Sequence, residues 1–576
     1  MSSAFIFKTK KIKKGNNMEE YRVYGSPGCG KTYWLANKGI PGALKKYPPE
    51  SIMVTSFSKA AAKVLTSRID GIDQKNIGTL HSICHRALGS PVVAETKIGM
   101  WNSVNPHWHI NGASIGQIDG DGVEGIQSNS REGEELLQRM NCLRGKLIPK
   151  KAWPEDVQHF AKEWQQFKDE TGYVDFTDLL ETAAKDMPYA PNNPNVMFID
   201  EAQDLNPLQL KICRQWGMHM DYYIVVGDDD QVLYSWLGAT AEAFLTPDVD
   251  EDHKRKLKQS YRVPKAVLQR AMKLIKQVSK REPKEYAPRK TASGRTVKGI
   301  CEDLSFGYKN TDALLEHMQW KLEAGRQVMI LTSCSYMLNP ILAALKSEGI
   351  PFHNPYQIKN VAWNPLARGE NKKVLAMDLL DAFFGSGPDE NYWTVKQFIT
   401  WAKYITVGPY GLQRGKGNKL IKKLEELVQA EADGLQSTRN VLTKILSDNA
   451  LTPALDRDID WLMDVMQAKR LQGMEFPTRV IKRHGKKALT TTPLVILSTI
   501  HSSKGSERTI VYLAPDISAK AYEELEYGAS QKEVFDNLCR QFYVGMTRAS
   551  EELYLLAPSS SGRRKSGLFF NLTNTL

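Results

Sequence analysis

The sequence has few cysteines, and none has the spacing of a disulfide framework or a zinc site. Seven cysteines are scattered over 576 residues, and no C-x-x-C motif occurs. An odd, scattered set of this kind excludes a disulfide-stapled fold and indicates a reduced, intracellular and cytoplasmic protein. The N-terminus lacks the apolar core of a signal peptide, and no run approaches the 18 apolar residues of a membrane span. We therefore expect no membrane partner.

Composition excludes several further classes. Hydrophobic residues make up 41% of the chain and charged residues 25%, which is typical of folded globular proteins and not of disordered or collagen-like chains. At about 150 residues per domain, the length predicts roughly four domains. The net charge of +12 favours a polyanionic partner such as nucleic acid, although only modestly for so long a chain.

The excess positive charge gathers in two segments. Residues 1–20 contain five lysines and two glutamates, a net of +3. This tail is either a solvated segment or a nucleic-acid-binding or targeting segment. Residues 357–490 contain 21 Lys and Arg against 15 Asp and Glu, a net of +6. Half of the excess charge therefore lies in that one stretch.

Two sets of short apolar runs alternate with helical stretches, which predicts two parallel α/β sheets. The first set comprises Tyr21–Tyr24, Ile52–Thr55, Val196–Ile199 and Tyr223–Val226. The second set comprises Val328–Leu331, Val495–Leu497, Ile510–Leu513 and Leu553–Leu556. Residues 89–174 and 357–490 interrupt this alternation and look mainly helical. We interpret them as inserted subdomains.

A phosphate-binding loop follows the first predicted strand. Residues 25–32 read G-S-P-G-C-G-K-T, which matches G-x-x-x-x-G-K-S/T, and a helical pattern comes next. Backbone N–H groups of such a loop surround phosphates, Lys31 would reach the β- and γ-phosphates, and Thr32 would bind Mg²⁺. Cys29 is better explained by packing than by a redox switch. The predicted ATP-binding loop is Gly25, Ser26, Pro27, Gly28, Cys29, Gly30, Lys31 and Thr32.

Two carboxylates follow the strand that ends at Ile199. The segment reads D-E-A-Q-D at 200–204. In a parallel sheet with a phosphate loop, Asp200 would hold Mg²⁺ and Glu201 would orient or deprotonate the attacking water. The sequence therefore predicts an ATPase that uses ATP and Mg²⁺.

Four further segments point to one kind of ATPase. They read V-G-D-D-D-Q-V-L-Y-S-W-L-G-A (226–239), L-K-Q-S-Y-R (257–262), T-I-H-S-S-K-G-S-E (499–507) and Y-V-G-M-T-R-A (543–549). With the phosphate loop and D-E-A-Q-D, in this order, they resemble the UvrD/Rep/PcrA family of superfamily-one helicases from about Tyr21 to Leu556. The resemblance implies an α/β fold with two RecA-like P-loop motor domains, each containing a parallel sheet and a mainly helical insertion.

The expected division of the chain follows from this resemblance. Residues 1–20 form the basic tail. The first motor comprises 21–88 and 175–257, with 89–174 inserted. The second comprises 258–356 and 491–576, with 357–490 inserted. The basic insertion 357–490 is then expected to supply affinity for duplex or for the DNA backbone.

The resemblance also implies roles around the nucleotide. Gln231 would sense the γ-phosphate, Tyr261 would stack on adenine, and Arg262 would contact the γ-phosphate. Glu507 would contact the ribose, and Arg548 would be the arginine finger of the second motor. Phosphoryl transfer needs positive charge at the equatorial oxygens, so ATP can draw the two motors together across a cleft.

Three segments resemble the strand-contacting or shared blocks of the family: 54–61, 78–88 and 175–180. Tyr234 and Trp236 are candidates for base stacking. The other candidate DNA contacts are Thr55, Phe57, His81, Thr499 and His501, each of which could instead be an ordinary packing residue. The helicase match disfavours zinc at His81, Cys84 and His85, and His107 and His109 are read as surface or packing residues.

Four departures qualify the resemblance. Residues 1–20 contain no glutamine for reading adenine, so other nucleoside triphosphates could serve. Ser56 precedes Phe57 where the family has an aromatic, and one residue along a strand reverses the face. Leu237 stands where the family often has arginine. After Leu556 the expected strand-separating hairpin is short and lacks an aromatic tip, and the chain has no room for a C-terminal nuclease domain.

The leading hypothesis is an ATP-dependent single-stranded DNA translocase and helicase with 3′→5′ direction, a direction that the resemblance alone implies. Its partners would be single-stranded DNA, single-strand/duplex junctions, and replication or repair proteins, and it would associate with the nucleoid in a prokaryotic or viral host. The short hairpin supports an alternative, a DNA-stimulated ATPase that strips or remodels protein–DNA complexes with little unwinding. An inactive DNA-binding scaffold is disfavoured by the intact ATPase residues.

Overall fold

The computed structural model describes residues 20–57, 66, 71–112, 132–357, 360–368, 374–385, 392–429 and 439–559. The basic tail up to residue 19 and the shortened hairpin after residue 559 lie outside the described residues, as do residues 58–61 of the first strand-contacting block. The predictions made for those segments stay predictions.

The first sheet contains six strands, and its neighbouring strands pair in parallel. All four predicted strands are confirmed. Their Val- and Ile-rich sequences suit a parallel sheet that is buried on both faces. The strands are β1 (Glu20–Gly25), β2 (Ile52–Ser56), β3 (Ile77–Thr79), β4 (Val196–Asp200), β5 (Tyr222–Gly227) and β6 (Lys254–Leu257). Their order is β3-β2-β4-β5-β1-β6. The carboxyl ends of β1, β4 and β5 therefore lie at one edge, where α/β sheets bind ligands.

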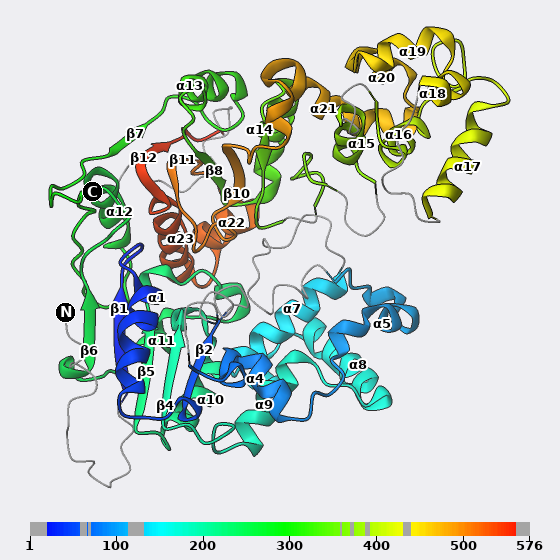
Figure 1. Ribbon diagram of the computed structural model, residues 1–576. Helices are drawn as coiled ribbons and strands as arrows, with labels where there is room; N and C mark the ends of the chain where they lie inside the picture. Colours follow the sequence, from blue (N-terminus) through cyan, green and yellow to red (C-terminus); the bar gives the residue numbers. More distant parts are fainter. Residues whose placement is uncertain are drawn as a thin grey trace. The chain divides into compact units, whose positions relative to one another are not determined.

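Helices cover this sheet (Figure 1). The helical stretch after the phosphate loop packs Trp34, Leu35 and Ile40 against Val23, Val54 and other apolar strand residues. This stretch is continuous from α1 (Lys31–Trp34) through a π-helical turn (Leu35–Gly39) to α2 (Ile40–Leu44). The other helices are α4 (Leu80–Ala87), α9 (Phe176–Asp186), α10 (Pro207–Gly217) and α11 (Ala241–Leu245).

The first insertion has a hydrophobic core of its own. Trp101, Phe160 and Trp164 are almost fully buried and pack against one another. Its helices are α5 (Ile98–Val104), α7 (Glu132–Gly145) and α8 (Glu155–Thr171). This stretch therefore has an aromatic core of its own, and its interpretation as an inserted subdomain stays a prediction.

The second sheet also has six strands, in the order β7-β12-β11-β8-β10-β9. The four predicted runs are again confirmed as strands, except that Leu556 lies just after the last one. The strands are β7 (Ile300–Asp303), β8 (Val328–Thr332), β9 (Phe352–His353), β10 (Val495–Thr499), β11 (Arg508–Leu513) and β12 (Ala549–Leu555). The accompanying helices are α12 (Lys265–Ile275), α13 (Thr311–Glu323), α14 (Asn339–Ser347), α22 (Ala519–Tyr527) and α23 (Gln531–Met546).

The predicted helical character of 357–490 is confirmed for its described part. Phe383, Trp393, Trp401 and Trp461 form an aromatic cluster inside it. The helices are α15 (Ala376–Phe384), α16 (Val395–Ala402), α17 (Gly417–Gln429), α18 (Arg439–Ile445), α19 (Asp448–Leu455), α20 (Ile459–Val465) and α21 (Ala468–His484).

The described chain divides into two compact units. One contains the described residues up to Asn310, Val328–Leu338 and those from Ser498 onward, and the other contains Thr311–Gln327 and the described residues of Asn339–Leu497. This division does not test the expected boundaries of two motors and two insertions, which stay a prediction. In the described part of the chain, no helix has the length and apolarity needed to cross a membrane.

Candidate functional site

The loop at 25–32 joins β1 to α1 and has the backbone of a phosphate-binding loop. Gly28 and Gly30 take left-handed conformations, with φ of 72° and 79°, which glycine adopts without a steric penalty. Lys31 is buried, and its Nζ donates to the backbone oxygen of Gly25 at 3.2 Å. The hydroxyl of Ser26 is buried and has no hydrogen-bond partner among the described residues. The loop therefore places an unsatisfied hydroxyl donor before the N-terminus of the following helix, where an anion is favoured.

The segment Ser260–Arg262 lies directly against this loop. The Ser260 hydroxyl donates to the backbone oxygen of Pro27 at 3.0 Å, and the Tyr261 N–H donates to the oxygen of Gly28 at 2.8 Å. A Cβ added at Gly28 would lie 2.4 Å from the Cβ of Arg262. Glycine is thus required at 28 both by the backbone conformation and by the close approach of Arg262.

The two predicted carboxylates stand at the end of β4, facing the loop. The Thr32 hydroxyl donates to Asp200 Oδ2 at 3.1 Å, and Gln203 Nε2 donates to Glu201 Oε2 at 2.5 Å. Burial and the adjacent Glu201 carboxylate raise the pKa of Asp200. Burial opposes ionisation of Glu201 as well, but Lys31 and Lys504 together hold its pKa below the ordinary value. Glu201 is therefore the ionised member of the pair and suits a group that orients water.

These residues fit a magnesium ion. Burial and the adjacent Glu201 raise the pKa of Asp200, so a bound cation would favour its ionised form, and the Thr32 hydroxyl adjoins it. Mg²⁺ is commonly held by one or two protein oxygens together with phosphate oxygens and water. Among the described residues, no group of three or more His, Cys, Asp or Glu could hold a metal ion, so the protein oxygens available here are few. When bound, Mg²⁺ would neutralise developing phosphate charge.

Gln231 follows β5 in a buried 3₁₀ turn, Asp229–Gln231. Its Nε2 donates to Asp228 Oδ2 at 2.7 Å, and the Asp228 N–H donates to Gln203 Oε1 at 2.9 Å. Because Gln203 also holds Glu201, one hydrogen-bonded chain connects the sensor residue predicted from the sequence with the water-orienting carboxylate. The sequence analysis did not single out Gln203 or Asp228, although both lie inside recognised segments.

The residues predicted to approach from the second motor gather near the loop, in the same compact unit. Arg262 forms an ion pair with Glu507, a partner other than the ribose predicted for Glu507. Tyr261 is 72% exposed, which leaves its ring accessible to a stacking partner. Arg548 is buried at the end of α23 and donates to the backbone oxygens of Val544 and Ser506 at 3.0 and 3.2 Å.

Lys504 is a functional candidate that the sequence analysis missed. Its Nζ pairs with Asp204, donates to the backbone oxygen of Gln231 at 3.1 Å, and lies 5.4 Å from the ring centroid of Tyr234. Burial raises the pKa of Asp204 to about 6, against the opposing effect of Lys504. Lys504 thus contacts the carboxylate segment, the sensor segment and an aromatic ring at once. Its place in T-I-H-S-S-K-G-S-E was the available signal.

Three predicted DNA-contacting aromatics lie together. Phe57 and Tyr234 are 4.7 Å apart between ring centroids, and Tyr234 and Trp236 are 6.1 Å apart. β2 ends at Ser56, so Phe57 lies just beyond the strand. The expected reversal of its face stays a prediction. Trp236 keeps partial exposure, whereas Phe57 and Tyr234 are buried.

The other predicted DNA contacts are more enclosed. Thr55 and Thr499 are each 1% exposed, and Thr499 Oγ1 donates to Ser502 Oγ at 3.2 Å. His81 is buried edge-on to Phe176, with centroids 6.0 Å apart. These environments account for the side chains by packing, and their contact with DNA stays a prediction.

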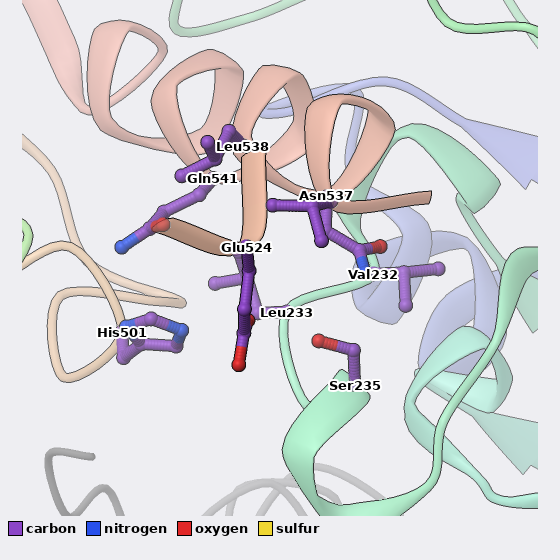
Figure 2. Close-up of a pocket in the computed structure, with 9 residues that line it drawn as sticks. Val232, Leu233, Ser235, His501, Glu524, Asn537, Leu538 and Gln541 are labelled. Carbon is purple, nitrogen blue, oxygen red and sulfur yellow. The ribbon is translucent and has the colours of Figure 1, made fainter. Parts of the chain in front are cut away.

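His501 lines a cavity of about 140 Å³ beside the aromatic group. Figure 2 shows His501, Glu524 and Ser235 around this hollow, and Asn537 and Gln541 reach it from α23. Burial lowers the pKa of His501 to about 4, so the ring is neutral at physiological pH. His501 can accept or donate one hydrogen bond there but adds no positive charge for phosphate.

The cysteines are free thiols: Cys29, Cys84, Cys142, Cys213, Cys301, Cys334 and Cys539. Burial raises the pKa of Cys29 to about 11 and that of Cys84 to about 12. A thiol with so high a pKa is a poor nucleophile and a poor redox switch. This supports a packing role for Cys29 in the phosphate loop.

Comparison with known proteins gives the same picture from another direction. Residues 9–252 match the family model of the UvrD/REP helicase N-terminal domain, and residues 494–556 match that of the UvrD-like helicase C-terminal domain. The chain is similar to the ATP-dependent DNA helicases PcrA of Staphylococcus epidermidis and Staphylococcus aureus, each 26% identical over 297 residues. These alignments cover 46% of this chain and 38% of each relative. The matched order of loop, carboxylates and later motifs, on two parallel sheets, leads to one conclusion: the chain belongs to the UvrD/Rep/PcrA-like helicases.

Proposed function

We propose that the protein is an ATP-dependent translocase and helicase on single-stranded DNA that moves 3′→5′. The observation that carries the proposal is the set of contacts made by Lys504, which links Asp204, the backbone of Gln231 and the ring of Tyr234. A motor needs its nucleotide site and its track to affect each other, and a shared side chain provides that link. The direction rests on the resemblance to the family.

The nucleotide chemistry follows from the chain's own groups. Lys31 and the loop N–H groups bind phosphates, Thr32 and Asp200 hold Mg²⁺, and Glu201 orients the attacking water. Arg262 and Arg548 supply positive charge from the second motor, with Gln231 as sensor. In this proposal Arg262, which forms an ion pair with Glu507, contacts the γ-phosphate when ATP is bound. Gain and loss of the contact between Arg262 and the γ-phosphate in each cycle of ATP hydrolysis would move one motor against the other.

The track-facing side is proposed to grip bases by stacking on Trp236, supported from behind by Tyr234 and Phe57. Exposed lysines of the insertion 357–490 would add sequence-independent affinity for the backbone near a junction. Thr55, His81, Thr499 and His501 would then shape the floor of the groove. The proposed partners are single-stranded DNA, single-strand/duplex junctions, and replication or repair proteins inside the cell.

Strand displacement with defined tails tests this proposal. ATP turnover is measured with and without single-stranded DNA, and unwinding is measured on otherwise identical 3′-tailed and 5′-tailed duplexes. We expect DNA-stimulated turnover and unwinding from the 3′ tail. Unwinding from the 5′ tail alone would refute the direction, and turnover that ignores DNA would refute the motor. Stimulated turnover with displacement of a bound protein but no unwinding would instead establish the remodelling alternative.

A further inference from the structure

A fully buried charge cluster lies behind Gln231, outside the groups assigned to the reaction. Asp228, Asp229, Asp230 and Lys284 are each completely enclosed. Lys284 Nζ donates to Asp228 Oδ1 at 2.7 Å, pairs with Asp229, and lies 3.2 Å from Asp230 Oδ2. Lys284 comes from the segment between α12 and β7, more than 50 residues later in the chain.

The cluster has two cations for three carboxylates. Arg281 binds Asp230 through two hydrogen bonds, of 2.9 and 2.7 Å. Burial raises the pKa of Asp229 to about 6, with Lys284 opposing that rise. Burial acts in the same sense on Asp230, but Lys284 and Arg281 prevail and hold its pKa below the ordinary value. Because buried carboxylates are costly unless paired, Lys284 is the residue that permits three of them in this turn.

The two carboxylate oxygens of Asp228 accept hydrogen bonds from different side chains. Oδ1 accepts from Lys284, and Oδ2 accepts from Gln231 Nε2 at 2.7 Å. One carboxylate therefore stands between a buried lysine and the amide of the sensor. With Oδ1 engaged, the carboxylate of Asp228 cannot turn without breaking its bond to Lys284. The amide of Gln231 is thereby held with its nitrogen toward Asp228.

The lysine's own segment is anchored on both sides. The Glu282 N–H donates to Asp229 Oδ2 at 2.8 Å. Arg540 of α23 donates to the backbone oxygens of Asp229 and Lys280, at 3.0 and 2.8 Å. The helix that ends near Arg548 thus meets the same turn, and Lys284 stands where the sensor turn, its own segment and α23 converge.

We propose that Lys284 is a positioning residue for ATP hydrolysis, which fixes Asp228 so that Asp228 holds the Gln231 amide in the orientation required at the γ-phosphate. This inference rests on the proposed function, since it presumes that Gln231 acts on the γ-phosphate. Lys284 itself touches neither nucleotide nor DNA in this role. Its effect reaches the reaction only through Asp228 and Gln231.

The test is a double-mutant cycle on steady-state ATP turnover of the full chain with saturating single-stranded DNA. The variants are Lys284→Met, Gln231→Ala and the combination of both, with Lys280→Met as matched control because Lys280 is a 63% exposed lysine of the same segment. We expect Lys284→Met to lower kcat by about tenfold or more, since misplacing a catalytic group by about 1 Å can cost a hundredfold. KM for ATP and the Kd for ADP should stay within about threefold of the unsubstituted protein, because the loop still binds phosphate. Lys280→Met should leave kcat unchanged.

The double-mutant cycle distinguishes a positioning role of Lys284 from a general loss of structure. In the Gln231→Ala background, Lys284→Met should lower kcat by less than about twofold, because its effect passes through the missing amide. An equal loss in both backgrounds, or a Lys284→Met variant with full kcat, would overturn the inference. If Lys284→Met does not fold, Lys284→Met with Asp229→Asn restores the charge balance of the cluster and replaces it in the cycle. Should neither variant fold, Asp228→Asn serves in their place. We expect Asp228→Asn to lower kcat in the unsubstituted background but not in the Gln231→Ala background. Full kcat of Asp228→Asn would refute the inference. Absence of DNA-stimulated turnover in the unsubstituted protein would instead refute the proposed function.

Discussion

Replacing Lys504 by methionine should uncouple ATP turnover from DNA. The substitution keeps the length and apolar stem of the side chain but removes its charge. It therefore breaks the pair with Asp204, the 3.1 Å hydrogen bond to the Gln231 oxygen and the contact with the Tyr234 ring. The side chains of Lys504 and Asp204 are 11% and 2% exposed, so solvent screens the pair little.

The expected magnitude follows from these contacts. A hydrogen bond to a charged group contributes about 1.5–3 kcal/mol, and a partly buried cation–π contact about 0.5–1 kcal/mol. Together they give a coupling of about 2–4 kcal/mol, and the lower figure corresponds to roughly 30-fold in a rate ratio. We therefore expect the ratio of DNA-stimulated to basal kcat to fall by about 30-fold or more.

The assay is steady-state ATP turnover with and without saturating oligodeoxythymidine, performed at pH 8, where Asp204 is ionised. Lys520→Met is the matched control, since Lys520 is a 71% exposed lysine that pairs with Glu135 at the surface. A Lys504→Met protein that keeps the stimulation ratio of the unsubstituted protein would refute the reasoning. So would a control that loses the ratio equally.

Four further outcomes are expected. Lys31→Ala should abolish ATP hydrolysis while single-stranded DNA binding, followed by fluorescence anisotropy, is largely kept; retained turnover would contradict the phosphate-loop assignment. Trp236→Ala should weaken DNA affinity by about 1–3 kcal/mol and lower stimulated turnover more than basal turnover, whereas an equal loss of both would make Trp236 structural. Glu95 is buried, and burial together with the nearby Asp175 raises its pKa to about 8. Its pKa in the folded state therefore exceeds that in the unfolded state. Because Glu95 ionises on unfolding, the free energy of unfolding falls as pH rises from about 4.5 to 8. Glu95→Gln should therefore stabilise by on the order of 3 kcal/mol at pH 7 and hardly at all at pH 4, and thermal melts with no pH-dependent difference would exclude this. Replacing the exposed Lys486 and Lys487 by glutamine should reduce the slope of log K against log salt by about 1.4–1.8, and an unchanged slope would place the backbone affinity elsewhere.

The strands of both sheets were largely predictable, because runs such as Val196–Ile199 must be buried on both faces of a parallel sheet. The strands that escaped prediction are short or polar. β3 has three residues, β6 reads K-R-K-L, β7 reads I-C-E-D, and β9 has two residues. Such segments join a sheet because their backbone pairs with a neighbouring strand, and side-chain pattern carries little of that information.

The nucleotide site was predictable to the extent that it follows strand ends. Gly25, Asp200 and Gly227 end three parallel strands, so the residues that follow them in the chain meet at one edge of the sheet. The pairings of Lys504 with Asp204 and of Lys284 with Asp228 span 300 and 56 residues. No local pattern marks a lone lysine for such a partner, and only the folded chain brings these charges together.

The close approach of Arg262 to Gly28 means that positions 28 and 261, which adjoin in the fold, differ in the substitutions that they tolerate. Gly28 admits no side chain, whereas Tyr261 is tied to the loop by its backbone N–H alone and extends its ring into solvent. The side chain at 261 can accordingly be exchanged without disturbing the loop. Tyr261→Trp would put an intrinsic fluorophore at the position predicted to stack on adenine, and smaller or larger rings at 261 offer a route to motors that accept modified nucleotides.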